Sequence, residues 1–189
     1  MSGSAFKAMS VEAYLRSEEH SPFRREYVGG FVYPLHAQAG ASEAHVLICT
    51  NLTAALHASA RRAGCRLYQS DMKLALAGAS TFFYPDVMVV CDPDDRATGY
   101  KTAPCLLIEV LSASPASHDR VGKFGLYTAL PSLQMYLIVE QSERRVYAYR
   151  RTGDQWPLRE LAGEGEIELP CLNTTLSLDE MYAGVLPSC

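Results

Sequence analysis

The sequence predicts an α/β (α+β) fold, in which a mixed central β-sheet is flanked by helices and preceded by an N-terminal hairpin. Two observations carry this prediction. Helical apolar spacing and β-branched, aromatic runs alternate along the chain, and their order is helix, three strands, helix, strands. At 189 residues the chain fits a single domain, 1–189, with a core at about 24–151 and an irregular tail at 152–189. Its 48% hydrophobic and 20% charged residues are typical of a globular protein.

Caps and turns indicate the elements of the N-terminal half. Ser10 and Ser42 are good N-caps, and Gly64 ends the second helix. Gly29-Gly30 joins two short β-prone runs into a hairpin. The predicted elements are a helix at 10–19, a hairpin at 26–33, a helix at 42–64 and a strand at 66–77.

The C-terminal half begins with two apolar segments, 82–90 and 105–111. The second is almost wholly apolar, which suggests a strand covered on both faces. In the first, Pro85 favours a strand edge or bulge. We then expect a helix at about 118–129, strands at 134–140 and 144–150, and a short helix near 177–183.

Charge and hydropathy limit the classes of function. No apolar run approaches the ~20 residues of a membrane span. The N-terminus lacks the apolar core of a secretion signal, so we expect a soluble, cytoplasmic protein. A net charge of −4 argues against nonspecific coating of DNA. Arginine pairs leave open a local basic rim, the alternative being solvated side chains at element ends. The arginines of this possible rim are 24, 25, 61, 62, 66, 144, 145, 150 and 151.

The six cysteines contain no Cys-x-x-Cys pair and mostly lie among apolar residues. We therefore expect core packing, not a disulfide frame or a zinc site. The five histidines lack the His-x-x-x-His spacing of a metal-binding helix.

Two carboxylates lie inside the apolar segments, Asp86 in the first and Glu109 in the second. A carboxylate is costly to bury without a partner. A hard divalent cation bound by both acids is one such partner, and buried ion pairs are another. If the two strands pair, both acids could hold one Mg²⁺, which would acidify a water and stabilise a phosphodiester under attack.

The following helix carries Asp119, Lys123 and Tyr127 at i, i+4 and i+8, on one face. Lys123 could point from this face toward the same water or phosphate. An exposed Asp–Lys pair worth only ~0.3–0.5 kcal/mol is the alternative.

These residues together resemble the Uma-type restriction endonuclease family, within the PD-(D/E)XK nuclease superfamily. The resemblance runs from about Glu26 to Arg150 and is without a gap from Glu109 to Tyr127. Its motifs in this sequence are Glu26 with Gly30, His45, Pro85-Asp86-Val87, Glu109-Val110-Leu111-Ser112, Asp119, Lys123 and Tyr127.

The resemblance implies a restriction-endonuclease-like core with Asp86, Glu109 and the backbone carbonyl of Val110 as ligands of Mg²⁺ or Mn²⁺. The superfamily's lysine would stand at position 111, where this sequence has leucine, and Lys123 is the candidate to replace it.

The resemblance also implies that an acid of the first core helix joins the site. Glu43 is the candidate for that acid, with His45 beside it, and Glu26 has a supporting role. The alternatives are a local hydrogen-bonding role for His45, and a place on the strand surface or in a buried salt bridge for Glu26.

The leading hypothesis is thus a metal-dependent endonuclease that hydrolyses phosphodiester bonds in DNA. We expect a homodimer, since cutting both strands of a duplex needs two sites. The second hypothesis is a nucleic-acid-binding or regulatory module on the same fold without efficient cleavage, favoured by the acidic charge and by Leu111. A third is a two-carboxylate hydrolase acting on a sugar.

Overall fold

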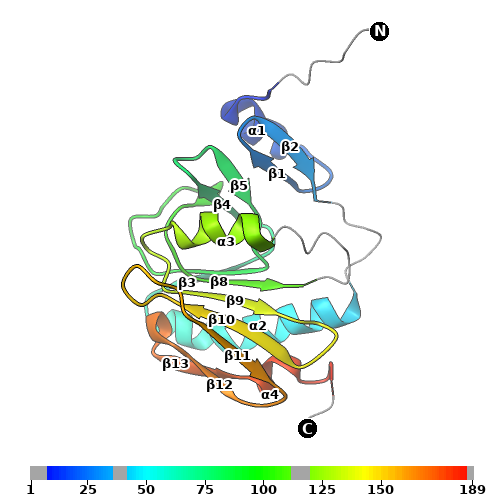
Figure 1. Cartoon of the computed structure of the whole chain (residues 1–189). Helices are drawn as coiled ribbons and strands as arrows, with labels where there is room; N and C mark the ends of the chain where they lie inside the picture. Colours follow the sequence, from blue (N-terminus) through cyan, green and yellow to red (C-terminus); the bar gives the residue numbers. More distant parts are fainter. Residues whose placement is uncertain (1–7, 36–41, 112–119, 187–189) are drawn as a thin grey trace.

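The computed structural model of the chain describes residues 8–35, 42–111 and 120–186 (Figure 1). Its helices are α1 (Val11–Glu18), α2 (Glu43–Arg62), α3 (Arg120–Thr128), α4 (Leu178–Tyr182) and the 3₁₀ helix η2 (Pro170–Leu172). The first seven strands are β1 (Arg25–Val28), β2 (Phe31–Pro34), β3 (Arg66–Gln69), β4 (Lys73–Leu76), β5 (Thr81–Phe83), β6 (Val87–Val90) and β7 (Tyr100–Lys101). The others are β8 (Pro104–Val110), β9 (Met135–Val139), β10 (Arg145–Arg150), β11 (Leu158–Ala162), β12 (Glu166–Leu169) and β13 (Thr174–Ser177).

The strands form two main sheets and a separate ribbon. The larger sheet has the order β11-β10-β9-β8-β6-β3, the smaller one β2-β1-β5-β4-β7, and β12 pairs with β13. In the larger sheet β8 and β9 run parallel and the other pairs antiparallel. Since parallel neighbours need a crossover, α3 lies in the connection between β8 and β9. The predicted mixed α+β fold is therefore confirmed.

The larger sheet is covered on both faces (Figure 1). Residues with odd numbers in β6, such as Val87 and Val89, pack in one core with α2 and the C-terminal elements. Their neighbours Met88 and Val90 pack in a second core with Tyr127 of α3. This two-residue period is that of a strand buried on both faces. The apolar runs in the sequence therefore correctly indicated a sheet that is covered on both sides.

The chain passes twice between the two sheets at one place. It leaves the larger sheet after β3 for β4, and it returns from β5 to β6 through Tyr84-Pro85-Asp86. The Ser70 N–H donates to the Asp86 carbonyl at 3.1 Å, which ties the two crossings together. Ser70 has φ of +44°, a left-handed turn that ends β3. Asp86 is thereby held at the junction of the sheets.

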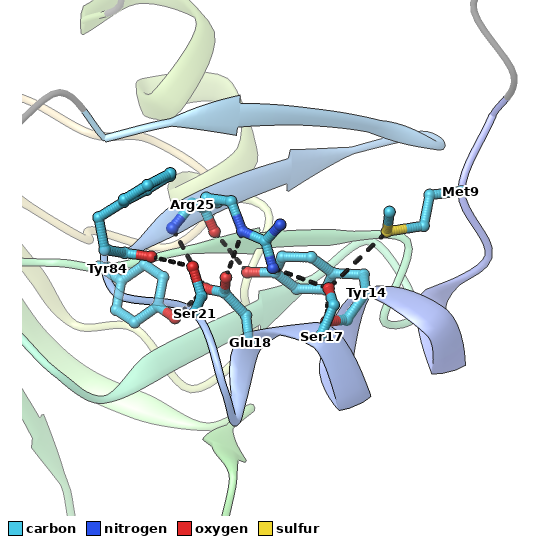
Figure 2. Close-up of polar contacts among 8 residues, drawn as sticks. Met9, Tyr14, Ser17, Glu18, Ser21, Arg25 and Tyr84 are labelled. Carbon is cyan, nitrogen blue, oxygen red and sulfur yellow. Dashed lines mark hydrogen bonds and ion pairs between the residues drawn. The ribbon is translucent and has the colours of Figure 1, made fainter.

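Helix α1 is anchored to this junction by a buried polar network (Figure 2). The Glu18 side chain is 2% exposed and accepts hydrogen bonds from Arg25 Nε at 2.7 Å and from the Tyr84 hydroxyl at 2.6 Å. The Tyr14 hydroxyl donates to the Arg25 carbonyl at 2.6 Å. Helix α1 is thus tied both to β1 and to the residues that precede Asp86.

Several predicted elements agree with the structure. Ser10 and Ser42 cap α1 and α2, and α2 ends two residues before Gly64. The hairpin forms with φ of +54° at Gly29 and +99° at Gly30, which two glycines tolerate without strain. No helix in the described part of the chain is long and apolar enough to cross a membrane.

Three expectations were wrong. Segment 66–77 is two strands in different sheets, because the chain turns at Ser70. The tail is not irregular, since β11 extends the larger sheet and β12–β13 form a ribbon. The cysteines are not mere core packing: Cys65 bonds to Cys91 and Cys105 bonds to Cys171. Each of these features joins segments far apart in sequence, which local patterns do not encode.

Candidate functional site

Asp86 and Glu109 come together because β6 and β8 pair. The antiparallel register places Val87 opposite Ile108, and one further step places Asp86 opposite Glu109. Residues opposite one another in an antiparallel pair have side chains on the same face. Asp86 Oδ2 also accepts a hydrogen bond from the Val110 N–H at 2.8 Å. The two acids predicted from sequence therefore share one site at the sheet junction.

Glu109 is enclosed by α3. Its Oε1 accepts a hydrogen bond from the Tyr127 hydroxyl at 2.7 Å and lies 3.8 Å from Lys123 Nζ. Burial raises the pKa of the Glu109 carboxyl to about 7; Asp86 adds to the rise, while Lys123 and Tyr127 oppose it. Burial and the Glu109 carboxylate raise the pKa of Tyr127 well above its usual value, so Tyr127 stays a neutral donor.

Lys123 links the hairpin to α3. Its Nζ lies 2.8 Å from Glu26 Oε1 in β1 and 4.9 Å from the centre of the Phe83 ring. The Lys123 and Glu26 side chains are only 15% and 11% exposed. The ammonium therefore stands between two carboxylates, closer to Glu26 than to Glu109.

His45 lies on α2 and contacts Asp86. Ser42 caps α2 by accepting the His45 N–H at 3.1 Å, and this holds His45 in the first turn. Its Nε2 lies 3.3 Å from Asp86 Oδ1. The hydrogen bond to Asp86 raises the pKa of His45, against the opposing effect of burial. Cys49, one helical turn further, completes a group with His45 and Asp86 whose ligand atoms all lie within 4.8 Å of one another.

The structure does not bring every predicted residue to this group. Glu43 is exposed, and among the described residues no hydrogen bond or ion pair joins it to Asp86 or Glu109. Residues two apart on a helix do not share a face, so Glu43 points away where His45 points inward. Asp119 lies outside the described residues. The roles of Glu43 and of the Val110 carbonyl stay predictions.

Two residues have a closer place in the site than the sequence suggested. Glu26 contacts the site lysine directly, and its signal was an acid between Arg25 and the apolar pair Tyr27-Val28. Cys49 was taken as core, although its i, i+4 spacing from His45 on a helix predicts a shared face.

The donor set suits a hard cation. Asp86 and Glu109 supply carboxylate oxygens, which Mg²⁺ prefers. The hydrogen bond from the Val110 N–H places the backbone of Val110 beside the Asp86 carboxylate. A cation would also relieve the repulsion between the two buried acids that helps to raise the pKa of Glu109.

Comparison with known proteins identifies a family and a fold. The model of the Uma2 family, described as "Putative restriction endonuclease", matches residues 11–180. Two uncharacterized proteins of Synechocystis sp. are similar over most of their length. The protein slr1290 is 34% identical over 95% of this chain and 94% of its own, and sll1609 is 38% identical over 86% and 93%.

A solved structure has a similar fold. It is that of a putative nuclease belonging to DUF820 from Anabaena variabilis, with a TM-score of 0.68 and 16% identity, over 94% of this chain and 99% of that one.

Proposed function

This chain belongs to the Uma2 family, and from that membership and the geometry of its site we propose that it is a metal-dependent endonuclease that hydrolyses phosphodiester bonds in DNA. The observation that carries the proposal is the meeting of Asp86, Glu109 and Lys123, which come from the residue before β6, the end of β8 and α3. Two acids and one ammonium in a half-buried site are the groups that phosphodiester hydrolysis needs.

Asp86, Glu109 and the Val110 carbonyl would hold Mg²⁺ or Mn²⁺. Glu109 Oε1 accepts the Tyr127 hydroxyl and Asp86 Oδ2 accepts the Val110 N–H, but a carboxylate oxygen has more than one lone pair, so both acids keep the capacity to bind a cation. The bound cation would activate a water and stabilise the charge on the phosphate. Tyr127 keeps the Glu109 carboxylate in one orientation, and the Val110 N–H does the same for Asp86.

Lys123 would stabilise the negative charge that develops on the phosphate or orient the attacking water. Glu26 would hold the ammonium in position through the 2.8 Å contact, and the Phe83 ring supports it from one side. His45 would position Asp86 through the contact between Nε2 and Oδ1. Glu26 and His45 are then positioning residues, each acting through a neighbour.

The test is cleavage of a supercoiled plasmid by the purified chain with Mg²⁺ or Mn²⁺. We expect metal-dependent nicking or linearisation, which Asp86→Asn lowers by at least roughly 100-fold because a ligand oxygen is lost. Asp94→Asn is the matched control, since Asp94 is 88% exposed and pairs only with Arg96 among the described residues. Intact DNA at every metal and pH tried would contradict the proposal, and so would equal activity in the two variants.

A second candidate is a DNA-binding module with little or no cleavage. It is favoured by the position of Lys123, whose Nζ lies 2.8 Å from Glu26 but 3.8 Å from Glu109. Binding of a labelled duplex in Ca²⁺, together with uncut DNA in Mg²⁺ and Mn²⁺, would identify this function.

We also propose a homodimer, because double-strand cleavage needs two sites. Sedimentation equilibrium should give about twice the 20.8 kDa of one chain.

A further inference from the structure

Four of the six cysteines form one cluster at the α2 side of the larger sheet. They are Cys65 between α2 and β3, Cys91 directly after β6, Cys105 in β8 and Cys171 in η2. All four belong to the core beneath α2 or pack against it. Four segments, up to 106 positions apart in sequence, thus each contribute one sulfur.

The two disulfides of this cluster lie next to each other. Cys91 Sγ of the first pair lies 3.4 Å from Cys105 Sγ of the second. The sulfurs of Cys91, Cys105 and Cys171 all lie within 4.8 Å of one another, and Cys65 is bonded to Cys91. In a tetrahedral zinc site with Zn–S near 2.3 Å, sulfurs stand roughly 3.8 Å apart. Three of the four sulfurs thus already stand near that spacing, and the Cys65 sulfur, which is bonded to Cys91, has to turn toward the other two once that bond is reduced.

We propose that these four cysteines, when reduced, form a structural site for a soft divalent metal of the zinc class. A dithiol gives each disulfide two electrons and two protons and is itself oxidised to a disulfide. The four thiols formed release four protons to solvent as they bind one Zn²⁺ through sulfur. A closed four-thiolate shell has no open position for water, so the ion would hold structure and perform no catalysis.

The position of the four cysteines determines which elements a bound ion would join. Cys91 and Cys105 lie at the opposite ends of β6 and β8 from Asp86 and Glu109, and about 13 Å of β8 separates Cys105 from Glu109. The ion would join α2, both strands and η2 at one point. It would thereby hold the two strands that carry the acids, without contact with the proposed nuclease site.

The test uses the full chain, produced and purified anaerobically with a dithiol and Zn²⁺, then analysed by native mass spectrometry. We expect one zinc per chain. A metal-free chain would overturn the proposal, whether it carries all four thiols or is lighter by the four hydrogens of two disulfides. Replacement of the zinc by Co²⁺ should give thiolate-to-cobalt charge-transfer absorption, and chelation of the metal should lower the temperature of thermal unfolding.

Variants separate this site from the other thiol in the described core. Cys49 stands next to His45 and Asp86 and could also bind cobalt. We expect Cys49→Ser to keep the charge-transfer band and Cys105→Ser to lose it. If the band is lost in Cys49→Ser and kept in Cys105→Ser, the thiolate-bound metal lies at the acidic site and the proposal fails. If Cys105→Ser does not fold, the zinc count of the wild type and the spectrum of Cys49→Ser still test the proposal. One zinc per chain and a band kept in Cys49→Ser support it, and a band lost in Cys49→Ser contradicts it.

Discussion

At the scale of single residues, the protonation of Glu109 is the property with the clearest measurable consequence. Its pKa is raised from 4.5 to about 7, first by burial. Between these two values the folded chain holds a proton that the unfolded chain has released. The carboxyl therefore contributes stability below about pH 4.5, and this stability is lost as the pH rises through 7.

We predict that the free energy of unfolding of the metal-free protein falls between pH 4.5 and 7, by roughly 1 to 3 kcal/mol from this residue. Glu109→Gln should remove that part of the slope, because an amide does not ionise. Urea unfolding at several pH values measures it, with the exposed Glu168→Gln as control. A slope unchanged in Glu109→Gln would refute the prediction. Mg²⁺ should restore stability to the wild type above pH 7, where the carboxylate is free to bind it.

At the scale of elements, α1 depends on one buried carboxylate. Glu18 is the point at which α1 meets β1 and Tyr84, and Tyr84 comes two residues before Asp86 (Figure 2). Removing one partner of a buried pair leaves the other charge without compensation. The effect should reach both stability and the position of the hairpin that carries Glu26.

We predict that Glu18→Gln lowers the free energy of unfolding by about 2–4 kcal/mol, since Arg25, 19% exposed, loses its charge partner. Glu19→Gln, the exposed neighbour, should change it by less than about 0.5 kcal/mol. Urea denaturation of both variants measures the difference. Equal stability would mean that Tyr14 and Tyr84 alone anchor the helix.

At the scale of the whole molecule, most of the arginines that suggested a basic rim have acidic partners. The ion pairs are Arg24–Asp71, Arg25–Glu18, Arg144–Asp179, Arg145–Glu143, Arg145–Glu160 and Arg150–Glu168. These pairs cover five of the nine arginines, so together with a net charge of −4 they reduce the positive charge that is available for phosphate contacts. DNA binding should then depend on a few groups near the site and on the divalent ion.

We predict that the affinity for a nonspecific duplex, measured in Ca²⁺ by fluorescence anisotropy, falls only weakly with added KCl. The slope of log K against log[KCl] should be shallower than about −3, which corresponds to about three phosphate contacts. Lys123→Gln should reduce the slope further, because Lys123 Nζ lies 3.8 Å from Glu109, whereas Arg150→Gln should not, because Arg150 lies beside Met135 at the end of β10 and pairs with Glu168. A steep slope would indicate a basic surface assembled in a dimer.

The sequence by itself determined most of the elements, the mixed sheet and the two acids with their helix lysine. These depend on local patterns: caps, periodicity, and carboxylates in apolar strands that need a partner. Tertiary structure decided the rest. Only the pairing of β6 with β8 sets Asp86 opposite Glu109, and only the hairpin's position brings Glu26 to Lys123. The split of segment 66–77, the strands of the tail and the four-cysteine cluster likewise depend on contacts between distant segments, which spacing along the chain does not encode.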